Sequence, residues 1–277
     1  MRIAVIPNRT KDTGLLQTKI LCDALNKANI EIVMADEYKD FGIACKFTDA
    51  ELYSGVDVVI VLGGDGTILQ ASDECAKRNI PIMGINLGRV GFMTETEQDD
   101  IPNAVLRLVA GDYKIEERMM MDVCFTDGEK TVTSLALNDC VVSKPDAQMI
   151  KAGVFADGEE ITEYTSDGVI IATPTGSTGY SLSAGGPVAD PKTDVFLATP
   201  ICAHSLKARP ALLASNKTIA VKLFDGANKH ADITVDGVVV GKLTTGGEIT
   251  IKKSKYFLKL IKFNNQSFYD ILTAKLL

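Results

Sequence analysis

Apolar residues in the first hundred positions form short runs rich in β-branched side chains, separated by segments with helical spacing. The runs predict strands at residues 3–6, 30–34, 56–62 and 80–85. Apolar residues three and four positions apart predict helices at residues 16–28, 68–76 and 102–110. Strands that alternate with helices in this way predict βαβ units on a parallel sheet.

After about residue 100 the pattern changes to short β-rich runs with turn signals between them. The runs lie at residues 119–125, 131–142, 152–155, 169–172, 219–224 and 249–251. Asp-Gly pairs, which are frequent in hairpin turns, begin at Asp127, Asp157, Asp225 and Asp236. This half therefore predicts a β-sandwich or stacked sheets. Residues 256–277 return to a strand and then a helix, and the pattern leaves open which domain they join.

Composition and charge narrow the class of protein. The chain has 277 residues, of which 46% are hydrophobic, a fraction that suits a folded core and argues against disorder. The net charge of −7 argues against a nucleic-acid or anionic-membrane partner, because phosphates attract clustered Lys and Arg. No apolar run approaches the roughly 20 residues that span a bilayer, and residues 1–7 do not predict a signal peptide.

Cysteine and histidine usage excludes further classes of site. The six cysteines are scattered without a C-x-x-C pair, which argues against a zinc ribbon or a disulfide framework. Reduced thiols in the cytoplasm are the expectation. With only His204 and His230 available and no G-x-S-x-G sequence, a Ser-His-Asp hydrolase is not expected.

A glycine-rich segment, Gly-Gly-Asp-Gly-Thr at residues 63–67, follows a predicted buried strand and opens a predicted helix. Glycines at such a junction let backbone N–H groups approach a phosphate, and the helix N-terminus adds positive potential. A carboxylate repels phosphate, so Asp65 makes sense if it faces a metal or a nucleophilic hydroxyl during phosphoryl transfer. The structural alternative is that Asp65 caps the helix and the glycines form a turn.

A second glycine-rich loop, residues 84–92, follows the next predicted strand. Because neighbouring parallel strands end at the same edge of a sheet, both loops would lie at the carboxyl edge, where open α/β sheets bind ligands. Tight turns would explain the same glycines equally well.

Residues 166–187 join an apolar strand to a loop that is dense in hydroxyls and glycines. Such a loop offers N–H groups and hydroxyls to sugar and phosphate oxygens, and Tyr180 adds a ring face or a hydroxyl. A purely structural loop rarely needs so many hydroxyls, so this density favours ligand binding. Asn138 and Asp139 interrupt another β-rich run, as a turn or bulge would, or as a clamp for ribose hydroxyls.

Taken together and in this order, these segments resemble the NAD kinase family. The resemblance rests on residues 63–67, residues 84–92, Asn138-Asp139, residues 167–187 and the His-Ser-Leu segment at 204–206. The glycine-rich segment 63–67 alone is less specific, because diacylglycerol kinases, sphingosine kinases and phosphofructokinases carry related loops.

The resemblance implies an α/β domain with a parallel sheet over residues 1–102, completed by residues 256–277, and a β-sandwich NAD-binding domain over residues 103–255. It implies transfer of a phosphoryl group from ATP, or from polyphosphate in some members, to the 2′-hydroxyl of the adenosine ribose of NAD. It also implies Mg²⁺ or another divalent cation and a homodimer or homotetramer.

By the same resemblance, Asp65 is the base or orienter for the 2′-hydroxyl, Asn138 and Asp139 hold ribose hydroxyls, and Asp167 contacts the nicotinamide end. Gly63, Gly64 and Gly66 would cradle phosphates. The other implied nucleotide-binding positions are Thr67, Gln70, Thr175, Thr178, Gly179, Tyr180, Ser181, Leu182, Ser183 and Cys202. No metal ligand is assigned.

Four positions depart from the family pattern. One is Val238, which replaces a frequent Gln and to which no binding role is assigned. Asp139 replaces the usual Glu and is one methylene shorter, Gly179 replaces a common Ala, and Gln70 replaces a frequent basic residue. Two other functions remain open. One is a lipid kinase of the diacylglycerol kinase type, which would share the 63–67 loop, and the other is a catalytically silent regulator that binds dinucleotides.

Overall fold

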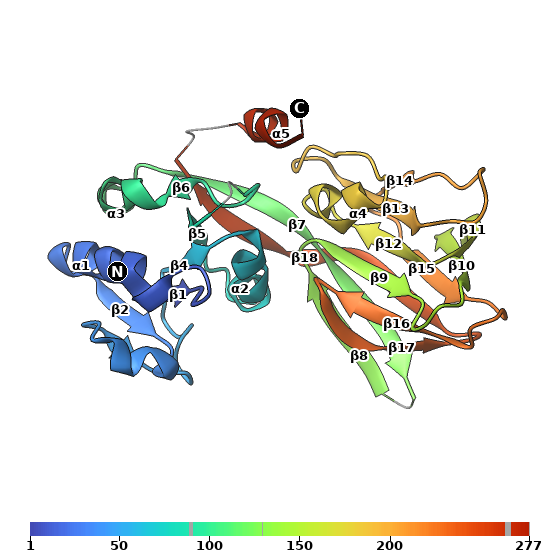
Figure 1. The fold of residues 1–277 in the computed structure, drawn as a ribbon, viewed down its shortest axis with the longest axis horizontal. Helices are drawn as coiled ribbons and strands as arrows, with labels where there is room; N and C mark the ends of the chain where they lie inside the picture. The colour runs from blue at the N-terminus through green and yellow to red at the C-terminus, as the bar shows by residue number, and fades with distance from the viewer. Residues whose placement is uncertain (89–90, 129, 264–266, 277) are drawn as a thin grey trace. The chain divides into compact units, whose positions relative to one another are not determined.

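The computed structural model describes residues 1–88, 91–128, 130–263 and 267–276. The chain forms two compact units, one of Met1–Glu117 with Leu258–Leu277 and the other of Arg118–Phe257 (Figure 1). The first unit ends after α3 (Ile101–Ala110), beyond residue 102 where the sequence prediction ended it, because α3 packs on α1 (Leu16–Lys27).

The first unit contains a parallel sheet with strands in the order β3-β2-β1-β4-β5, and β6 also pairs with β5. The strands are β1 (Arg2–Pro7), β2 (Glu31–Met34), β3 (Lys46–Phe47), β4 (Val58–Gly63), β5 (Ile82–Asn86) and β6 (Thr96–Glu97). The other helices are α2 (Asp65–Lys77), α5 (Phe268–Leu276) and the 3-10 turns η1 (Thr13–Leu15), η2 (Asp36–Phe41) and η3 (Gln98–Asp100). The predicted alternation of strands and helices on a parallel sheet is confirmed.

Helices cover both faces of this sheet. Every residue of β4 is buried, as expected of a central strand, and Ile60 and Leu62 join a core that also holds Leu25 of α1 and Val105 of α3. The helix α2 packs on β4 and β5. Gly63 at the end of β4 is in register with Asn86 at the end of β5, so the two glycine-rich loops start at the same carboxyl edge, as predicted.

The second unit is a sandwich of two sheets. One sheet runs β11-β10-β15-β18 with antiparallel pairing and also includes β7 and β8, while the other runs β14-β13-β12-β9-β16-β17 and is antiparallel throughout. Buried residues of both sheets, among them Val154 of β10 and Val169 of β12, form one core. The predicted all-β second half is confirmed.

The elements of this unit follow one another in chain order. They are β7 (Lys114–Asp127), β8 (Lys130–Ala136), β9 (Asp139–Ser143), β10 (Ile150–Ala156), β11 (Glu159–Ser166), β12 (Gly168–Ala172), η4 (Gly176–Thr178), α4 (Tyr180–Ser183), β13 (Val195–Ile201), β14 (Ala211–Ala214), β15 (Ile219–Leu223), β16 (His230–Val235), β17 (Val238–Thr244) and β18 (Glu248–Lys262). The first residues of β7 and the last residues of β18 belong to the α/β unit.

Two details of the sequence prediction were wrong. The run at 131–142 is two strands, β8 and β9, because the chain leaves the sheet at Leu137 and Asn138. Asp225-Gly226 is not a hairpin turn, since it links β15 to β16 and these strands lie in different sheets. By contrast, Asp157 and Asp236 each have a positive φ, as does the following glycine, and join paired strands.

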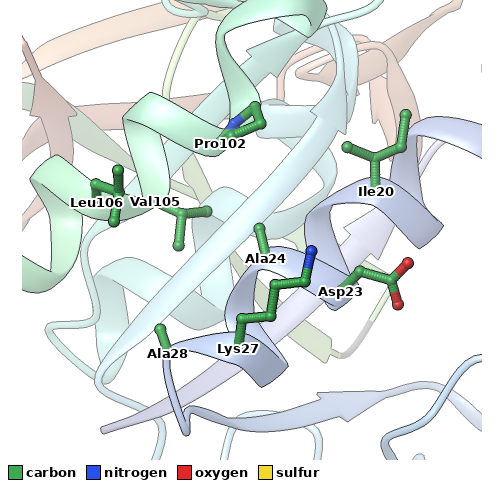
Figure 2. A pocket seen from close by; sticks show the side chains of 8 residues that line it. All are labelled: Ile20, Asp23, Ala24, Lys27, Ala28, Pro102, Val105 and Leu106. Carbon is green, nitrogen blue, oxygen red and sulfur yellow. The ribbon is translucent and has the colours of Figure 1, made fainter.

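A groove of about 460 Å³ lies on the surface of the α/β unit and is lined by residues of α1 and α3 (Figure 2). Its lining consists of Ile20, Asp23, Ala24, Lys27, Ala28, Pro102, Val105 and Leu106, and none of these is a predicted site residue. No helix among the described residues is long and apolar enough to cross a bilayer.

Candidate active site

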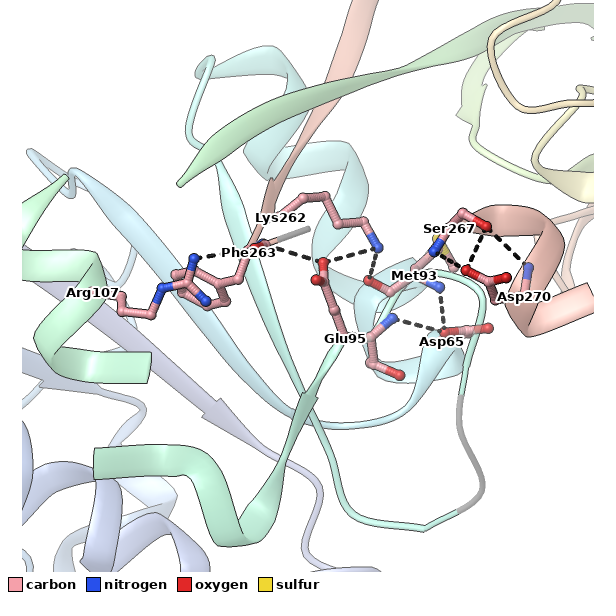
Figure 3. A network of polar contacts seen from close by, with 9 residues as sticks. Asp65, Met93, Glu95, Arg107, Lys262, Phe263, Ser267 and Asp270 are labelled. Carbon is pink, nitrogen blue, oxygen red and sulfur yellow. Dashed lines mark hydrogen bonds and ion pairs between the residues drawn. The ribbon is translucent and has the colours of Figure 1, made fainter. Parts of the chain in front are cut away.

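The carboxylate of Asp65 binds the backbone of the second glycine-rich loop. Oδ2 accepts the N–H of Phe92 at 2.8 Å, and Oδ1 accepts the N–H groups of Met93 at 3.1 Å and Thr94 at 3.4 Å. Figure 3 shows Asp65 beside Met93. Asp65 is the first residue of α2, and its side chain forms no cap for that helix. The structural alternative of a helix cap is therefore replaced by a link between the two glycine-rich loops.

Gly91 makes this link possible. A Cβ at position 91 would collide with Asp65 Oδ1 and lie 2.5 Å from Thr94 Oγ1. The preceding loop residues, Arg89 and Val90, lie outside the described residues. Thr94 Oγ1 and Asn86 Oδ1, from the same loop region, are buried and have no hydrogen-bond partner among the described residues. Buried polar atoms without partners call for an explanation, and a bound ligand or water would supply one.

The first glycine-rich loop is tightly packed at Gly63 and unobstructed at Gly66. A Cβ on Gly63 would collide with Thr67 Oγ1, which accepts a hydrogen bond from Asn8 Nδ2 at 3.0 Å, so the Thr67 hydroxyl is used within the fold. A Cβ on Gly66 would have no heavy atom of the described residues within 4 Å. Gly66 therefore leaves room for a ligand at the start of α2, where backbone N–H groups favour anions.

Lys11 is a functional candidate that sequence reasoning missed. Its Nζ atom would lie 2.8 Å from a Cβ on Gly64, which brings a cation to the glycine-rich loop. A lone lysine in the loop after β1 carries no sequence signal. Gln70, in contrast, lines a separate cavity of about 180 Å³ together with Glu37, Tyr38 and Tyr53.

In the β-sandwich unit, Asp236 holds the bend at Leu137 and Asn138, where the chain passes from β8 to β9. The Asp236 carboxylate accepts the N–H groups of Leu137 at 2.7 Å, Asn138 at 2.8 Å and Asp139 at 3.1 Å. Asp236 looked like a simple turn residue in the sequence, because its partners lie almost a hundred positions away. Asn138 thus lies in a bend between two strands and Asp139 begins β9, so the interruption of the β-rich run is confirmed.

The hydroxyl-rich loop packs directly on this bend. A Cβ on Gly176 would collide with the backbone carbonyl oxygen of Asn138, and a Cβ on Gly179 would lie 3.8 Å from Asn138 Nδ2 and 3.9 Å from Asp139 Oδ2. The Oδ1 atom of Asn138 is buried and accepts no hydrogen bond from the described residues. The structure therefore brings together Asn138, Asp139 and the 175–179 loop, with an acceptor that lacks a donor.

Many hydroxyls of the loop are used inside the fold, contrary to the inference drawn from their density. Thr173 Oγ1 donates to the carbonyl of Leu137 at 2.5 Å, Ser177 Oγ donates to that of Pro174 at 2.7 Å, and Thr178 Oγ1 donates to that of Thr175 at 3.2 Å. Ser181 is fully buried and shares a hydrogen bond of 2.9 Å with Thr199. These hydroxyls replace backbone partners that an irregular loop lacks.

The remaining candidates differ in exposure. Tyr180, Ser183 and Cys202 are exposed, Leu182 is half-buried, and Thr175 is buried beside Arg118, whose Nη1 donates to Thr175 Oγ1 at 3.4 Å. Arg118, also buried, was not singled out from the sequence. Asp167 forms an ion pair of 2.8 Å with Lys144, so its carboxylate already has a cationic partner.

Burial and, to a smaller extent, the nearby Asp236 carboxylate together raise the pKa of the Asp139 carboxyl to about 7. A neutral carboxyl near pH 7 could donate as well as accept a hydrogen bond.

This shift predicts a pH-dependent stability. Because the Asp139 pKa is higher in the folded state than in the unfolded state, the contribution of its protonated carboxyl to the free energy of unfolding is fully present below about pH 4. This contribution is lost as pH rises through 7. Asp139→Asn removes this loss, which we expect to reach about 4 kcal/mol, at 1.36 kcal/mol per pKa unit. Urea unfolding at pH 5 and pH 8 measures it: the wild type should weaken with pH more than the variant. If the free energy of unfolding changed with pH equally in the two proteins, the raised pKa of Asp139 would be contradicted.

No group of three or more His, Cys, Asp or Glu side chains within the described ranges is arranged to hold a metal ion.

Comparison with known proteins agrees with this geometry. Family models match the chain twice, as the ATP-NAD kinase N-terminal domain at residues 3–113 and the ATP-NAD kinase C-terminal domain at residues 137–263. The NAD kinase of Acetivibrio thermocellus is 35% identical over 100% of this chain and 97% of its own length. That of Lachnoclostridium phytofermentans is 38% identical over 99% of this chain and 98% of its own.

Two solved structures share the fold. The yeast NADH kinase complexed with NADH has a TM-score of 0.90 at 22% identity, and covers 100% of this chain and 87% of its own. The NAD kinase of Archaeoglobus fulgidus in complex with ATP has a TM-score of 0.78 at 29% identity, and covers 99% of this chain and 98% of its own. Both halves of the chain match the family, and this protein therefore belongs to the NAD kinase family and is a kinase.

Proposed function

We propose that this protein phosphorylates the 2′-hydroxyl of the adenosine ribose of NAD, with ATP or polyphosphate as the donor. The observation that carries the proposal is the Asp65 carboxylate, which three backbone N–H groups hold at the unobstructed end of a glycine-rich loop. The ATP and NADH complexes of the two similar structures support nucleotide binding by this fold.

Asp65 keeps room for a substrate hydroxyl. A carboxylate has about four lone-pair positions. Among the described residues, Oδ2 accepts only the Phe92 N–H, whereas Oδ1 accepts two donors. We propose that the ribose 2′-hydroxyl donates to Oδ2 and passes its proton there as the phosphoryl group arrives. Such assistance is worth about 10²–10⁴-fold in rate.

Asn138 and Asp139 would hold NAD by its ribose hydroxyls. The buried Oδ1 of Asn138 lacks a donor, and a ribose hydroxyl can supply one. Asp139 is one methylene shorter than the usual Glu, but it lies beside Gly179, where the missing Cβ leaves space for a ligand to approach. The exposed ring of Tyr180 offers a surface on which an adenine can stack.

The donor would bind at the glycine-rich loop. The N–H groups at the start of α2 and the ammonium of Lys11 both favour phosphate. We propose that Mg²⁺ or another divalent cation enters bound to the triphosphate, since Mg²⁺ is commonly held by substrate phosphates and one or two carboxylates. The resemblance to the family also leads us to propose a homodimer or homotetramer in the cytoplasm.

Lys11→Met tests the phosphate site. We expect the KM for ATP to rise about tenfold, in line with about 1.4 kcal/mol for a lost charge-assisted contact, while the KM for NAD changes little. Steady-state kinetics with each substrate varied in turn measures both constants. Lys39→Met, at an exposed position on η2, is the control. An unchanged KM for ATP would exclude Lys11 from the donor site.

One assay separates the proposed function from the alternatives. The protein is incubated with ATP labelled at the γ-phosphate, Mg²⁺, and NAD, NADH or diacylglycerol in vesicles. We expect label in NAD. Label in diacylglycerol alone would identify a lipid kinase, and tight NAD binding without transfer would identify a silent regulator.

A further inference from the structure

A buried ion pair lies behind the loop that holds Asp65. Lys262, at the end of β18, places Nζ 3.9 Å from Glu95 Oε2, and the two side chains are only 11% and 5% exposed. A buried ammonium or carboxylate is costly unless it is paired and hydrogen-bonded. The pair therefore fixes the position of each partner.

Each partner also binds the backbone next to the other. Lys262 Nζ donates to the carbonyl of Met93 at 3.3 Å, and Glu95 Oε2 accepts the N–H of Phe263 at 3.3 Å (Figure 3). Arg107 of α3 secures the strand end from the other direction, because its Nη2 donates to the carbonyl of Phe263 at 3.1 Å and its guanidinium lies 4.7 Å from the centre of the Phe263 ring. The end of β18 is thus clamped to residues 93–95.

Met93 connects this clamp to the carboxylate. Its carbonyl accepts the hydrogen bond from Lys262, and its N–H donates to Asp65 Oδ1 at 3.1 Å. A displacement of the Met93 backbone therefore changes where the Asp65 carboxylate points. Misplacement of a catalytic group by about 1 Å can cost on the order of 10²-fold in rate.

We propose that Lys262 and Glu95 are positioning residues that orient Asp65 through the backbone of Met93. This inference rests on the proposed role of Asp65 in phosphoryl transfer to NAD. Neither side chain needs to contact the substrate, so the proposal predicts a loss of kcat without a matching change in the KM for NAD.

The kinetic test uses Lys262→Met, which removes the charge and keeps the length, and Glu95→Gln, which keeps an acceptor for Phe263. We expect each to lower kcat at least tenfold and to change the KM for NAD less than twofold. In an Asp65→Asn background, Lys262→Met should cost less than twofold more, because residues that act as one unit are not additive. Lys259→Met, on the same strand and partly exposed, should keep full activity.

A second measurement does not depend on activity. Amide hydrogen exchange of residues 92–94 should be at least tenfold faster in Lys262→Met than in the wild type or in Lys259→Met. If Lys262→Met does not fold, Glu95→Gln serves in both measurements. Unchanged exchange, or losses that multiply fully with Asp65→Asn, would overturn the positioning role. A wild type that transfers no phosphoryl group to NAD would instead overturn the proposed function, and the exchange result would still decide the clamp.

Discussion

Asp65→Asn should lower kcat for NAD phosphorylation by about 10²–10⁴-fold while the protein remains folded. The amide keeps one oxygen for the N–H groups of the loop but loses the charge and the basicity that accept the proton of the ribose hydroxyl. Its NH₂ group would face a backbone N–H, so we also expect a stability loss of about 1–2 kcal/mol. Steady-state kinetics and urea unfolding measure the two effects.

Asp73→Asn is the matched control for this substitution. Asp73 lies on the same helix, is partly exposed, and pairs with Lys77 at 2.7 Å, so its loss should change neither kcat nor stability by much. If Asp65→Asn kept wild-type kcat, Asp65 would be a structural link between the loops and another group would have to accept the proton.

Of the glycine-to-alanine substitutions in the β-sandwich unit, Gly176→Ala should lower the folding stability most. The added Cβ would collide with the Asn138 backbone carbonyl, and a backbone that Asp236 already holds by three N–H groups cannot yield cheaply. We expect a loss of about 2–3 kcal/mol in the free energy of unfolding, together with weaker NAD binding because the Asn138 bend is displaced. Urea unfolding and calorimetric titration with NAD measure these changes.

Gly179→Ala provides the contrast within the same loop. A Cβ there would lie 3.3 Å from its nearest atom, the carbonyl oxygen of Gly176, so only a small adjustment is needed. We expect less than about 1 kcal/mol of destabilisation, with NAD binding retained. Equal losses for the two variants would show that the close contact at Gly176 is not what fixes the bend.

The regular elements of the fold could be predicted because their signals are local. The β-branched run that became β4 and the helical spacing of α1 are visible within ten or so residues. The position of both glycine-rich loops at one edge of the sheet could also be predicted, since neighbouring parallel strands end at the same edge. The boundary between the units was less predictable, because it depends on the packing of α3 on α1 and not on composition.

The candidate site was predictable only in part. Asp65 and the two glycine-rich loops carried their own signal, but the partners of Asp65 did not, since Phe92 and Met93 contribute backbone N–H groups that any residue has. Asp236 and Lys262 act over separations of about 100 to 170 residues, and a single sequence shows no sign of such pairing. The hydroxyl count of the 173–181 loop could not show which hydroxyls bond within the fold, because hydroxyls that bind a ligand and hydroxyls that replace backbone partners look alike in a sequence.

The position of the transferred phosphate tests the account most directly. The protein is incubated with NAD, ATP labelled at the γ-phosphate, and Mg²⁺, and the nucleotide product is analysed by phosphorus NMR. We predict that the label appears in NADP as a phosphate on the 2′-oxygen of the adenosine ribose, and that it is lost in Asp65→Asn. Folded wild-type protein that leaves NAD unlabelled, or that phosphorylates it at another oxygen, would contradict the role assigned to Asp65.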